Sequence, residues 1–302
     1  MFKIIEGKAG EQGSNEWLEL RRSMITASEW PIIAGAMTKY GETPFKLYNA
    51  KMQGLVKESN FAMERGKRLE EEARISINDQ LEIDAKPLVV TSTNFPWLLA
   101  SLDGWHEETK TLVEIKCPLG ANYAMAAEGE IPKYWKMQGD VQMMVLGIDT
   151  MYFFIYSDGG PSYLIKHKLN PSHVKKIAQT TKEFYDCMAT LSPPALCDND
   201  YAIIDDKEAN ELARLLINEM HDLKRKEEIV KALKAQLLDL TDDGNCAFSD
   251  APLKISRSNG RSSVDYKALC KDLGVGAEEL KKYTKQGIGY PVFKITKDLE
   301  VL

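Results

Sequence analysis

Residues 97–118 read WLLASLDGWHEETKTLVEIKCP, and this stretch decides the fold. The apolar run 97–102 predicts a buried strand that stops at Asp103-Gly104, a residue pair common in turns. Residues 111–117 alternate in side-chain character before a proline, which predicts a second strand. The sequence therefore predicts two neighbouring strands with a short polar connection between them.

Three charged side chains lie on or beside these two strands. Glu114 and Lys116 are two residues apart, so both side chains project from one face of their strand. Asp103 precedes them in the order D-x(10)-E-x-K and can lie beside them. Two carboxylates and a backbone carbonyl are oxygen ligands suited to Mg²⁺, and a lysine can offset charge on an attacked phosphate. An isolated E-x-K pair is also common on surface strands, but the full order favours metal-dependent phosphodiester hydrolysis.

A mixed α/β unit is predicted around this pattern, over residues 1–190. Apolar spacing, helix formers and caps predict helices over 15–22, 44–53, 61–80, 132–147 and 171–190, and a capping box predicts a further helix start at Thr26-Ala27-Ser28-Glu29. Further strands are predicted over 87–93, 151–157 and 162–169, the last two joined as a hairpin at Asp158-Gly159-Gly160-Pro161. Gly139, inside a predicted helix, indicates close backbone packing at that position.

A second region follows the boundary predicted at Ser192-Pro193-Pro194. Residues 191–245 form a linker and a long charged helix over 206–240, and residues 246–302 form a small α+β module. That module is predicted to contain a strand, a turn at Asn259-Gly260, a helix from Ser263 and a last strand at 290–296. In the long helix Leu216, Leu223, Val230 and Leu237 recur every seven residues, but Glu219 and Lys226 interrupt the companion row, so a coiled-coil seam is imperfect.

Composition excludes several classes of protein. The chain has 302 residues, 44% hydrophobic and 28% charged, which is ordinary for a globular protein. Its net charge of −6 excludes a generally basic nucleic-acid coat but not a local basic groove. No apolar run is long enough for a membrane span. Five cysteines without a CxxC pair predict reduced thiols and a cytoplasmic location. The histidines (His106, His167, His173 and His221) lack metal-ligand spacing and are predicted to be non-catalytic.

The motifs in their order resemble the lambda exonuclease / YqaJ-type viral recombinase family of PD-(D/E)XK nucleases. The resemblance covers about residues 12–190. It rests on QGSNEWLELRRSMITASE at 12–29, GKRLEEEAR at 66–74, SLDGW at 101–105, VEIKCP at 113–118 and PKYWKMQGDVQMMVLG at 132–147. It implies an α/β fold with a restriction-endonuclease-like core, a central mixed sheet flanked by helices, to which this chain adds a long helix and a small α+β tail.

The resemblance also implies roles for single residues in a metal site. Asp103, Glu114, the Ile115 carbonyl and Glu70 would hold Mg²⁺, for which Mn²⁺ could substitute, and Lys116 would be the catalytic lysine. Glu71 and Glu72 are expected on a solvated helix face. Gln138 matches the active-site glutamine of the family, although Gly139-Asp140 replace the usual Q-x-Q continuation. Gln142 is the alternative active-site glutamine, or else a helix surface residue.

A second group of residues resembles the family's pocket for a terminal 5′-phosphate. Arg21, Thr26 and Ser28 would form it, since arginine makes bidentate phosphate contacts and a helix N-terminus offers N–H donors to an anion. Thr26 as an ordinary N-cap and Arg22 as the phosphate contact remain alternatives. Basic residues that could contact DNA phosphates are Lys46, Lys51, Arg65, Lys67, Arg68, Lys133 and Lys136, most of which are expected to be solvated surface charges.

The function that the resemblance implies is a Mg²⁺-dependent, double-strand-specific DNA exonuclease. It would degrade one strand from a 5′ end and leave a 3′ overhang for a single-strand annealing partner. The family also implies a ring-shaped homotrimer around DNA. Two alternatives stay open: an endonuclease of restriction or repair type on the same core, and a non-catalytic DNA-binding scaffold. A terminal-phosphate pocket argues against the first, and an intact Asp103, Glu114 and Lys116 set argues against the second.

Overall fold

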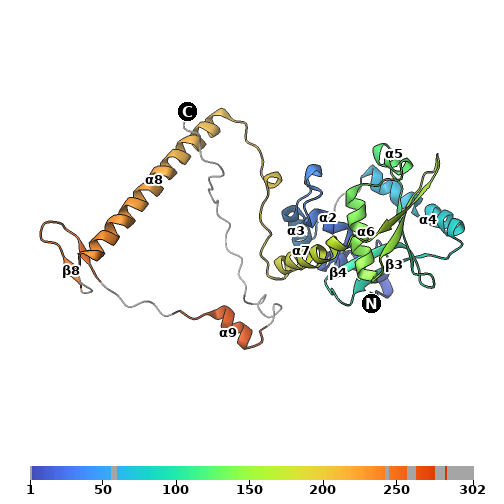
Figure 1. The fold of residues 1–302 in the computed structure, drawn as a ribbon, viewed down its shortest axis with the longest axis horizontal. Helices are drawn as coiled ribbons and strands as arrows, with labels where there is room; N and C mark the ends of the chain where they lie inside the picture. The colour runs from blue at the N-terminus through green and yellow to red at the C-terminus, as the bar shows by residue number, and fades with distance from the viewer. Residues whose placement is uncertain (1, 56–59, 242–244, 257–262, 276–282, 284–302) are drawn as a thin grey trace. The chain divides into compact units, whose positions relative to one another are not determined.

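The structure is a computed structural model that describes residues 2–55, 60–241, 245–256, 263–275 and 283. The chain divides into two units, Met1–Tyr201 and Ala202–Leu302 (Figure 1). Residues just after the predicted boundary still belong to the first unit, in which Thr43 Oγ1 donates to Asp200 Oδ1 at 2.5 Å. The predicted domain limits at residues 190 and 245 stay predictions.

The first unit is built on a mixed sheet. Among the described residues its strands are β1 (Phe2–Ile4), β2 (Ile25–Thr26), β3 (Lys86–Ser92), β4 (Leu98–His106), β5 (Thr111–Lys116), β6 (Thr150–Ile155) and β7 (Tyr163–Lys168). Their order is β1-β3-β4-β5-β6-β7, with β2 beside β4. The β5–β6 and β2–β4 pairs are parallel and the others antiparallel. The predicted mixed sheet and the β6–β7 hairpin are therefore confirmed.

Helices cover both faces of this sheet (Figure 1). They are α1 (Asn15–Ser23), α2 (Trp30–Ile33), α3 (Pro44–Gln53), α4 (Phe61–Leu81), α5 (Ala121–Ala127), α6 (Lys133–Leu146) and α7 (Pro171–Ala189). On one face, α4 packs Leu69 and Ala73 against Val113 and Ile115 of β5. The other face carries α6 and α7 over the larger core, which includes Leu112. The alternation of Leu112 and Val113 between two cores is the period-two pattern of a strand buried on both sides.

The predicted turn at Asp103-Gly104 is wrong. Strand β4 continues to His106, and the turn lies at residues 107–110. Gly104 pairs with Val113 of β5, and a Cβ on Gly104 would approach Ala85 Cβ to 3.3 Å. Strand pairing and a close side-chain approach thus outweigh the local turn preference of an Asp-Gly pair. Asp103 consequently lies within a strand rather than at its end.

The helix predicted to start at Thr26 is shorter than expected. A 3₁₀ turn, η2 (Ala27–Glu29), follows Thr26 and leads into the four residues of α2. Glu29 Oε2 accepts from the Thr26 N–H at 2.8 Å, so this half of the predicted capping box forms. The short elements β1 and α5 were not predicted, because three to seven residues give too few repeats for a periodic pattern.

The second unit contains α8 (Lys207–Asp239), the hairpin β8 (Cys246–Ala247) and β9 (Lys254–Ile255), and α9 (Tyr266–Asp272). The predicted turn at 259–260 and strand at 290–296 lie outside the described residues. None of the helices in the described ranges has the length and apolar character needed to cross a membrane.

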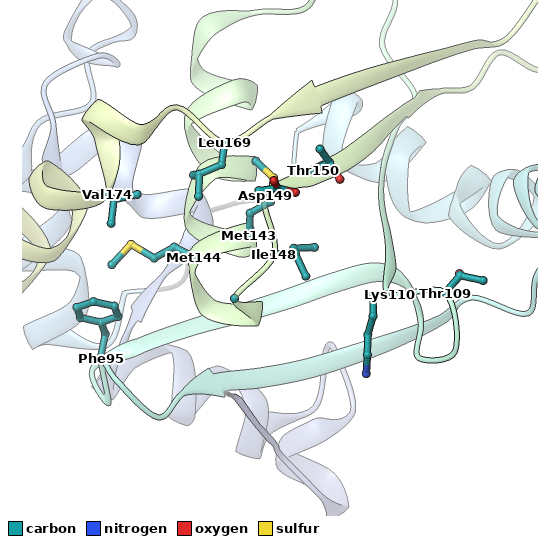
Figure 2. Close-up of a pocket in the computed structure, with 11 residues that line it drawn as sticks. Phe95, Thr109, Lys110, Met143, Met144, Ile148, Asp149, Thr150, Leu169 and Val174 are labelled. Atoms are coloured by element: carbon teal, nitrogen blue, oxygen red, sulfur yellow. The ribbon is translucent and has the colours of Figure 1, made fainter.

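A hollow of about 690 Å³ lies where the end of α6 meets the start of β6 (Figure 2). Met143, Met144 and Ile148 give it an apolar wall, and Lys110 from the β4–β5 turn lies at its side. None of the predicted site residues lines this hollow. The predicted site residues therefore lie elsewhere on the sheet.

Candidate active site

Glu114 and Lys116 meet on β5 as their spacing predicts. Lys116 Nζ donates to Glu114 Oε1 at 2.7 Å. Glu114 is only 2% exposed, while the Lys116 side chain retains 23%. The lysine ammonium can therefore reach a bound molecule while the carboxylate beside it is buried.

Two glutamines of α6 hold the buried carboxylate. Gln138 Nε2 donates to Glu114 Oε1 at 2.5 Å, and Gln142 Nε2 donates to Glu114 Oε2 at 2.6 Å. Four residues apart, the two share one face of the helix. Gln142 is fully buried, so a surface position for it is excluded. Gln138 Oε1 also accepts from Lys116 at 3.4 Å, which makes Gln138 the glutamine next to the lysine.

Asp103 on β4 faces the same region. Its Oδ2 accepts from the Ile115 N–H at 2.8 Å, where regular pairing between β4 and β5 has ended. Burial raises the pKa of Asp103 well above its usual range, and the neighbouring Glu114 and Glu70 raise it further, while Lys116 lowers it. The folded chain thus gathers negative charge at a half-buried position, which is unfavourable unless a proton or a cation offsets it.

Glu70 reaches the site from α4 and is held there by Arg74. Arg74 Nη2 pairs with Glu70 Oε1 at 2.6 Å, and its Nε donates to the Asp103 carbonyl at 2.7 Å. Arg74 also pairs with Glu71 and is only 8% exposed. Burial raises the pKa of Glu70, Arg74 lowers it and Glu114 raises it. Arg74 was not predicted, although its place four residues after Glu70 is a signal that the sequence offers.

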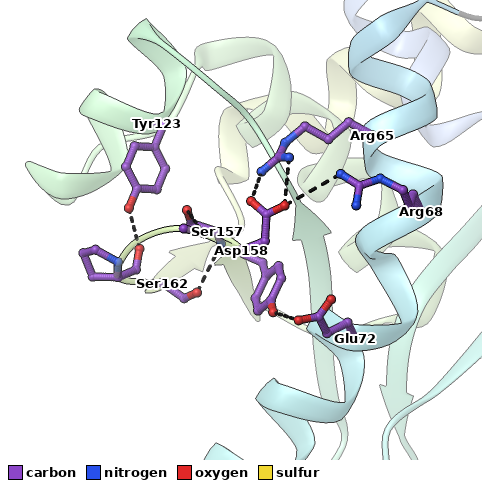
Figure 3. A network of polar contacts seen from close by, with 10 residues as sticks. Arg65, Arg68, Glu72, Tyr123, Ser157, Asp158 and Ser162 are labelled. Carbon is purple, nitrogen blue, oxygen red and sulfur yellow. Dashed lines mark hydrogen bonds and ion pairs between the residues drawn. The ribbon is translucent and has the colours of Figure 1, made fainter.

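The two glutamates that follow Glu70 in α4 behave as predicted for a helix surface. Glu71 and Glu72 are both exposed. Glu72 accepts from Tyr156 O–H at 2.5 Å (Figure 3). The glutamate register is therefore the one expected, with Glu70 facing the site.

The oxygen donors of this site have the chemistry that Mg²⁺ requires. The described residues contain no group of three or more His, Cys, Asp or Glu side chains already placed to hold a metal together. The predicted metal site uses instead the carboxylates of Asp103 and Glu114 and the Ile115 carbonyl as ligands, with waters in the remaining coordination positions. The N–H and C=O of one strand residue point toward the same neighbouring strand. The Ile115 N–H points toward Asp103 of β4, so the Ile115 carbonyl points toward β4 as well.

Lys116 keeps its charge in this setting. Burial lowers the pKa of Lys116, but Glu114, Asp103 and Glu70 raise it, and the net direction is upward. A lysine with a raised pKa is an electrostatic partner for a phosphate rather than a general base at neutral pH.

The predicted 5′-phosphate residues gather around α1 and β2. Arg21 stacks its guanidinium over the Trp17 ring at 4.6 Å from the centroid. Burial lowers the pKa of Arg21 and Glu29 raises it. Thr26 Oγ1 and Ser28 Oγ lie 3.2 Å apart, with Thr26 buried and Ser28 exposed. The group thus offers one stacked guanidinium and one exposed hydroxyl.

Two neighbouring basic residues have structural contacts instead. Arg22 Nε donates to the Lys51 carbonyl at 3.0 Å, which favours Arg21 over Arg22 as the anion contact. Lys51, only 6% exposed, donates to the carbonyls of Arg21 and Met24 at 2.6 and 2.8 Å and pairs with Glu29 at 2.8 Å. Lys51 is therefore excluded as a DNA contact, since its ammonium is buried under α1.

Ser101 of β4 connects the two groups of residues. Trp17 Nε1 donates to Ser101 Oγ at 3.1 Å, and Gln142 Nε2 donates to the Ser101 carbonyl at 3.2 Å. Trp17 carries Arg21, and Gln142 holds Glu114. A short series of contacts therefore joins the stacked arginine to the buried carboxylate.

Other candidate DNA contacts already have acidic partners. Arg65 Nη2 pairs with Asp158 Oδ1 at 2.6 Å, and Arg68 approaches the same carboxylate at 3.7 Å (Figure 3). Lys136 pairs with Glu130 at 2.7 Å, whereas Lys46 donates to a backbone carbonyl at 2.9 Å. Lys67 and Lys133 are exposed, as expected for solvated surface charges.

The departure from Q-x-Q in α6 has a structural reason. A Cβ at Gly139 would lie 2.6 Å from Met151 Sδ, so the predicted close packing is confirmed. Asp140 is fully buried, and its two oxygens contact His167 Nε2 at 2.9 Å and His173 Nδ1 at 2.5 Å. This cluster ties α6 to β7 and α7 and was not predicted.

The mixed sheet with Asp103, Glu114 and Lys116 on adjacent strands defines a restriction-endonuclease-like PD-(D/E)XK core. Residues 16–149 match the YqaJ-like viral recombinase domain, the family that the sequence motifs resemble.

Solved structures show the same fold. The alkaline exonuclease LHK-Exo from Laribacter hongkongensis is 23% identical, with a TM-score of 0.50 over 58% of this chain and 92% of that one. LHK-Exo in complex with dAMP is 22% identical, with a TM-score of 0.51 and the same coverage. No curated protein matches the sequence.

Proposed function

We propose that this protein is a metal-dependent exonuclease that degrades one strand of double-stranded DNA from a 5′ end. The observation that carries this proposal is the joining of two groups through Ser101: the Arg21–Trp17 stack and the Glu114 carboxylate beside Lys116. An end-processing nuclease needs both, one to hold the terminal phosphate and one to cleave the strand. The family and the fold of LHK-Exo support a phage-type exonuclease.

Asp103, Glu114 and the Ile115 carbonyl, assisted by Glu70, would hold the metal, for which Mg²⁺ and Mn²⁺ are the proposed ions. Mg²⁺, when bound, lowers the pKa of a water and offsets charge on the scissile phosphate. The chain's own groups do the rest. Lys116 stabilises negative charge that develops on the attacked phosphate. The two glutamines fix the Glu114 carboxylate, and Gln138 also orients the lysine.

The proposed product is duplex DNA with a 3′ single-stranded overhang, the substrate of a single-strand annealing protein in phage-type recombination. Arg21 and Ser28 would hold the new 5′-phosphate after each cleavage, so the next phosphodiester enters the site. A homotrimeric ring around the duplex is part of the proposal, and the family resemblance supports it. The setting would be the cytoplasm of a bacterium or of a phage-infected cell.

The test is cleavage of linear and covalently closed duplex DNA with Mg²⁺, labelled at the 5′ or the 3′ end. We expect loss of linear DNA alone, early release of 5′ nucleotides and a preference for 5′-phosphorylated ends. Arg21→Gln should lose that preference, whereas the matched control Arg22→Gln should keep it. Cutting of the closed circle would establish an endonuclease instead, and Mg²⁺-independent binding without cleavage would establish a scaffold.

A further inference from the structure

Helix α8 presents an apolar stripe to solvent along its length. Its 33 residues make a helix of about 50 Å, and none of them is buried. Leu212, Leu216, Leu223, Val230 and Leu233 are 42–59% exposed. A stripe of this size is normally covered by a partner, because exposed apolar patches are unfavourable in water.

The stripe follows a heptad repeat with two charged residues in its seam. One row contains Ala209, Leu216, Leu223, Val230 and Leu237, and the companion row contains Leu212, Glu219, Lys226, Leu233 and Leu240. In the nomenclature of coiled coils these rows are the a and d positions. Glu219 and Lys226 thus occupy consecutive d positions of opposite charge at the middle of the helix.

A parallel pair of α8 helices is disfavoured by these charges. In parallel register each d residue faces its own copy, so Glu219 would face Glu219 and Lys226 would face Lys226. The flanking g and e positions would bring Asp222 against Glu227, a further like-charge contact. Like charges at close range cost binding free energy, and the same holds for a parallel trimer.

An antiparallel pair turns the same residues into attractive contacts. Antiparallel coils place a residues opposite d residues, and one register aligns the two helices over their whole length. Leu216 then faces the partner's Leu233, Leu223 faces the partner's Lys226, and Glu219 faces the partner's Val230. Glu219 and the partner's Lys226 lie in adjacent layers, within reach of an ion pair. Every layer keeps at least one apolar residue, and the outer layers are wholly apolar.

We infer that α8 is a self-association helix that pairs antiparallel with α8 of a second copy of this chain. The central charges specify the antiparallel direction, and the outer leucines supply the apolar area. The pairing is independent of the proposed nuclease chemistry, since it uses no residue of the candidate active site. If the catalytic units also form a ring, pairing through α8 joins two rings, and the assembly contains an even number of chains.

The test is the mass of the full-length chain by sedimentation equilibrium. Glu219→Lys or Lys226→Glu should weaken the pairing by roughly tenfold or more, because each replaces two attractive contacts by repulsive ones, and the mass should halve. The double variant, and an equimolar mixture of the two single variants, should restore the original mass. Glu228→Lys is the matched control, because Glu228 lies on the opposite helix face and its variant should leave the mass unchanged.

Disulfide cross-linking tests whether the two helices run parallel or antiparallel. The wild-type chain is the control, because it shows any cross-linking through the native cysteines. A mixture of Leu216→Cys and Leu233→Cys chains should form a cross-linked dimer, whereas Leu216→Cys alone should not. Cross-linking of Leu216→Cys with itself would establish a parallel pair and overturn the inference. An unchanged mass in Glu219→Lys and Lys226→Glu, with helicity intact by circular dichroism, would show that α8 packs on its own chain or on another partner.

Discussion

In the unit Met1–Tyr201 several charged side chains are buried and paired, whereas along α8 the charged side chains stay in solvent. Arg74, Lys51 and Lys116 each contact two or three acceptors, and the first two are under 10% exposed. In α8 the ion pairs are local, such as Arg225 with Asp222 at 3.1 Å. Removal of one partner from a buried ion pair destabilises the fold strongly, whereas an exposed ion pair contributes little to the free energy of folding. The same residue types therefore fix a site in one unit and select a partner in the other.

The largest expected effect is loss of cleavage in Lys116→Ala. Removal of the ammonium beside the scissile phosphate should lower the rate by about 10³-fold or more. The measurement is Mg²⁺-dependent hydrolysis of 5′-phosphorylated linear duplex, with Lys231→Ala on exposed α8 as the matched control. Near wild-type cleavage by Lys116→Ala would remove the lysine from the proposed mechanism.

The second effect compares a buried with an exposed arginine. Arg74→Met should reduce the free energy of unfolding by about 2 kcal/mol, because it leaves the Asp103 carbonyl and Glu70 without their donor. Arg214→Met on exposed α8 should change that free energy by less than about 0.5 kcal/mol. Urea unfolding of both variants measures the difference. Equal losses would contradict the distinction between the two units.

The third prediction concerns pH and metal. The folded chain raises the pKa of Asp103 above its ordinary value of 3.8, so it binds this proton more tightly than the unfolded chain does. This contribution to stability is present at low pH and is lost as the pH rises through the raised pKa. Thermal unfolding between pH 4 and 8 should show it, and Asp103→Asn should flatten the dependence.

At a pH above the raised pKa of Asp103, added Mg²⁺ should raise the unfolding temperature of the wild type. The cation then offsets the negative charge of the carboxylates, because the proton has left. Asp103→Asn should show a smaller rise. A wild type that gains no stability from Mg²⁺ or Mn²⁺ would argue against the proposed metal site, whatever its activity.

The smallest effect tests the connection through Ser101. Trp17→Phe keeps the stacking ring but loses the N–H donor, so cleavage of 5′-phosphorylated ends should fall by roughly fivefold, about 1 kcal/mol. Trp97→Phe is the matched control, because Trp97 Nε1 donates to Thr181 Oγ1 at 3.0 Å away from the site. Equal effects of both variants on the phosphate preference would mean that the Ser101 contact only stabilises the fold.

The sequence by itself determined the elements whose signals are local. The periodic patterns predicted α4, α6, β5 and the β6–β7 hairpin within a few residues of their bounds. The two-residue spacing brought Glu114 and Lys116 to one face, whereas the choice of Glu70 over its neighbours rested on the family resemblance. The motif order pointed to the YqaJ-like domain that residues 16–149 match, because it preserves the succession of short segments along the chain.

Only the tertiary structure decided the contacts between distant segments. Pairing with β5 carried β4 through the expected turn at Asp103-Gly104, and packing under α1 buried Lys51. Arg74 and Gln142 entered the site because α4 and α6 dock on opposite faces of one sheet. No local pattern encodes such partners, since burial and the choice of acceptor depend on which surfaces meet after folding.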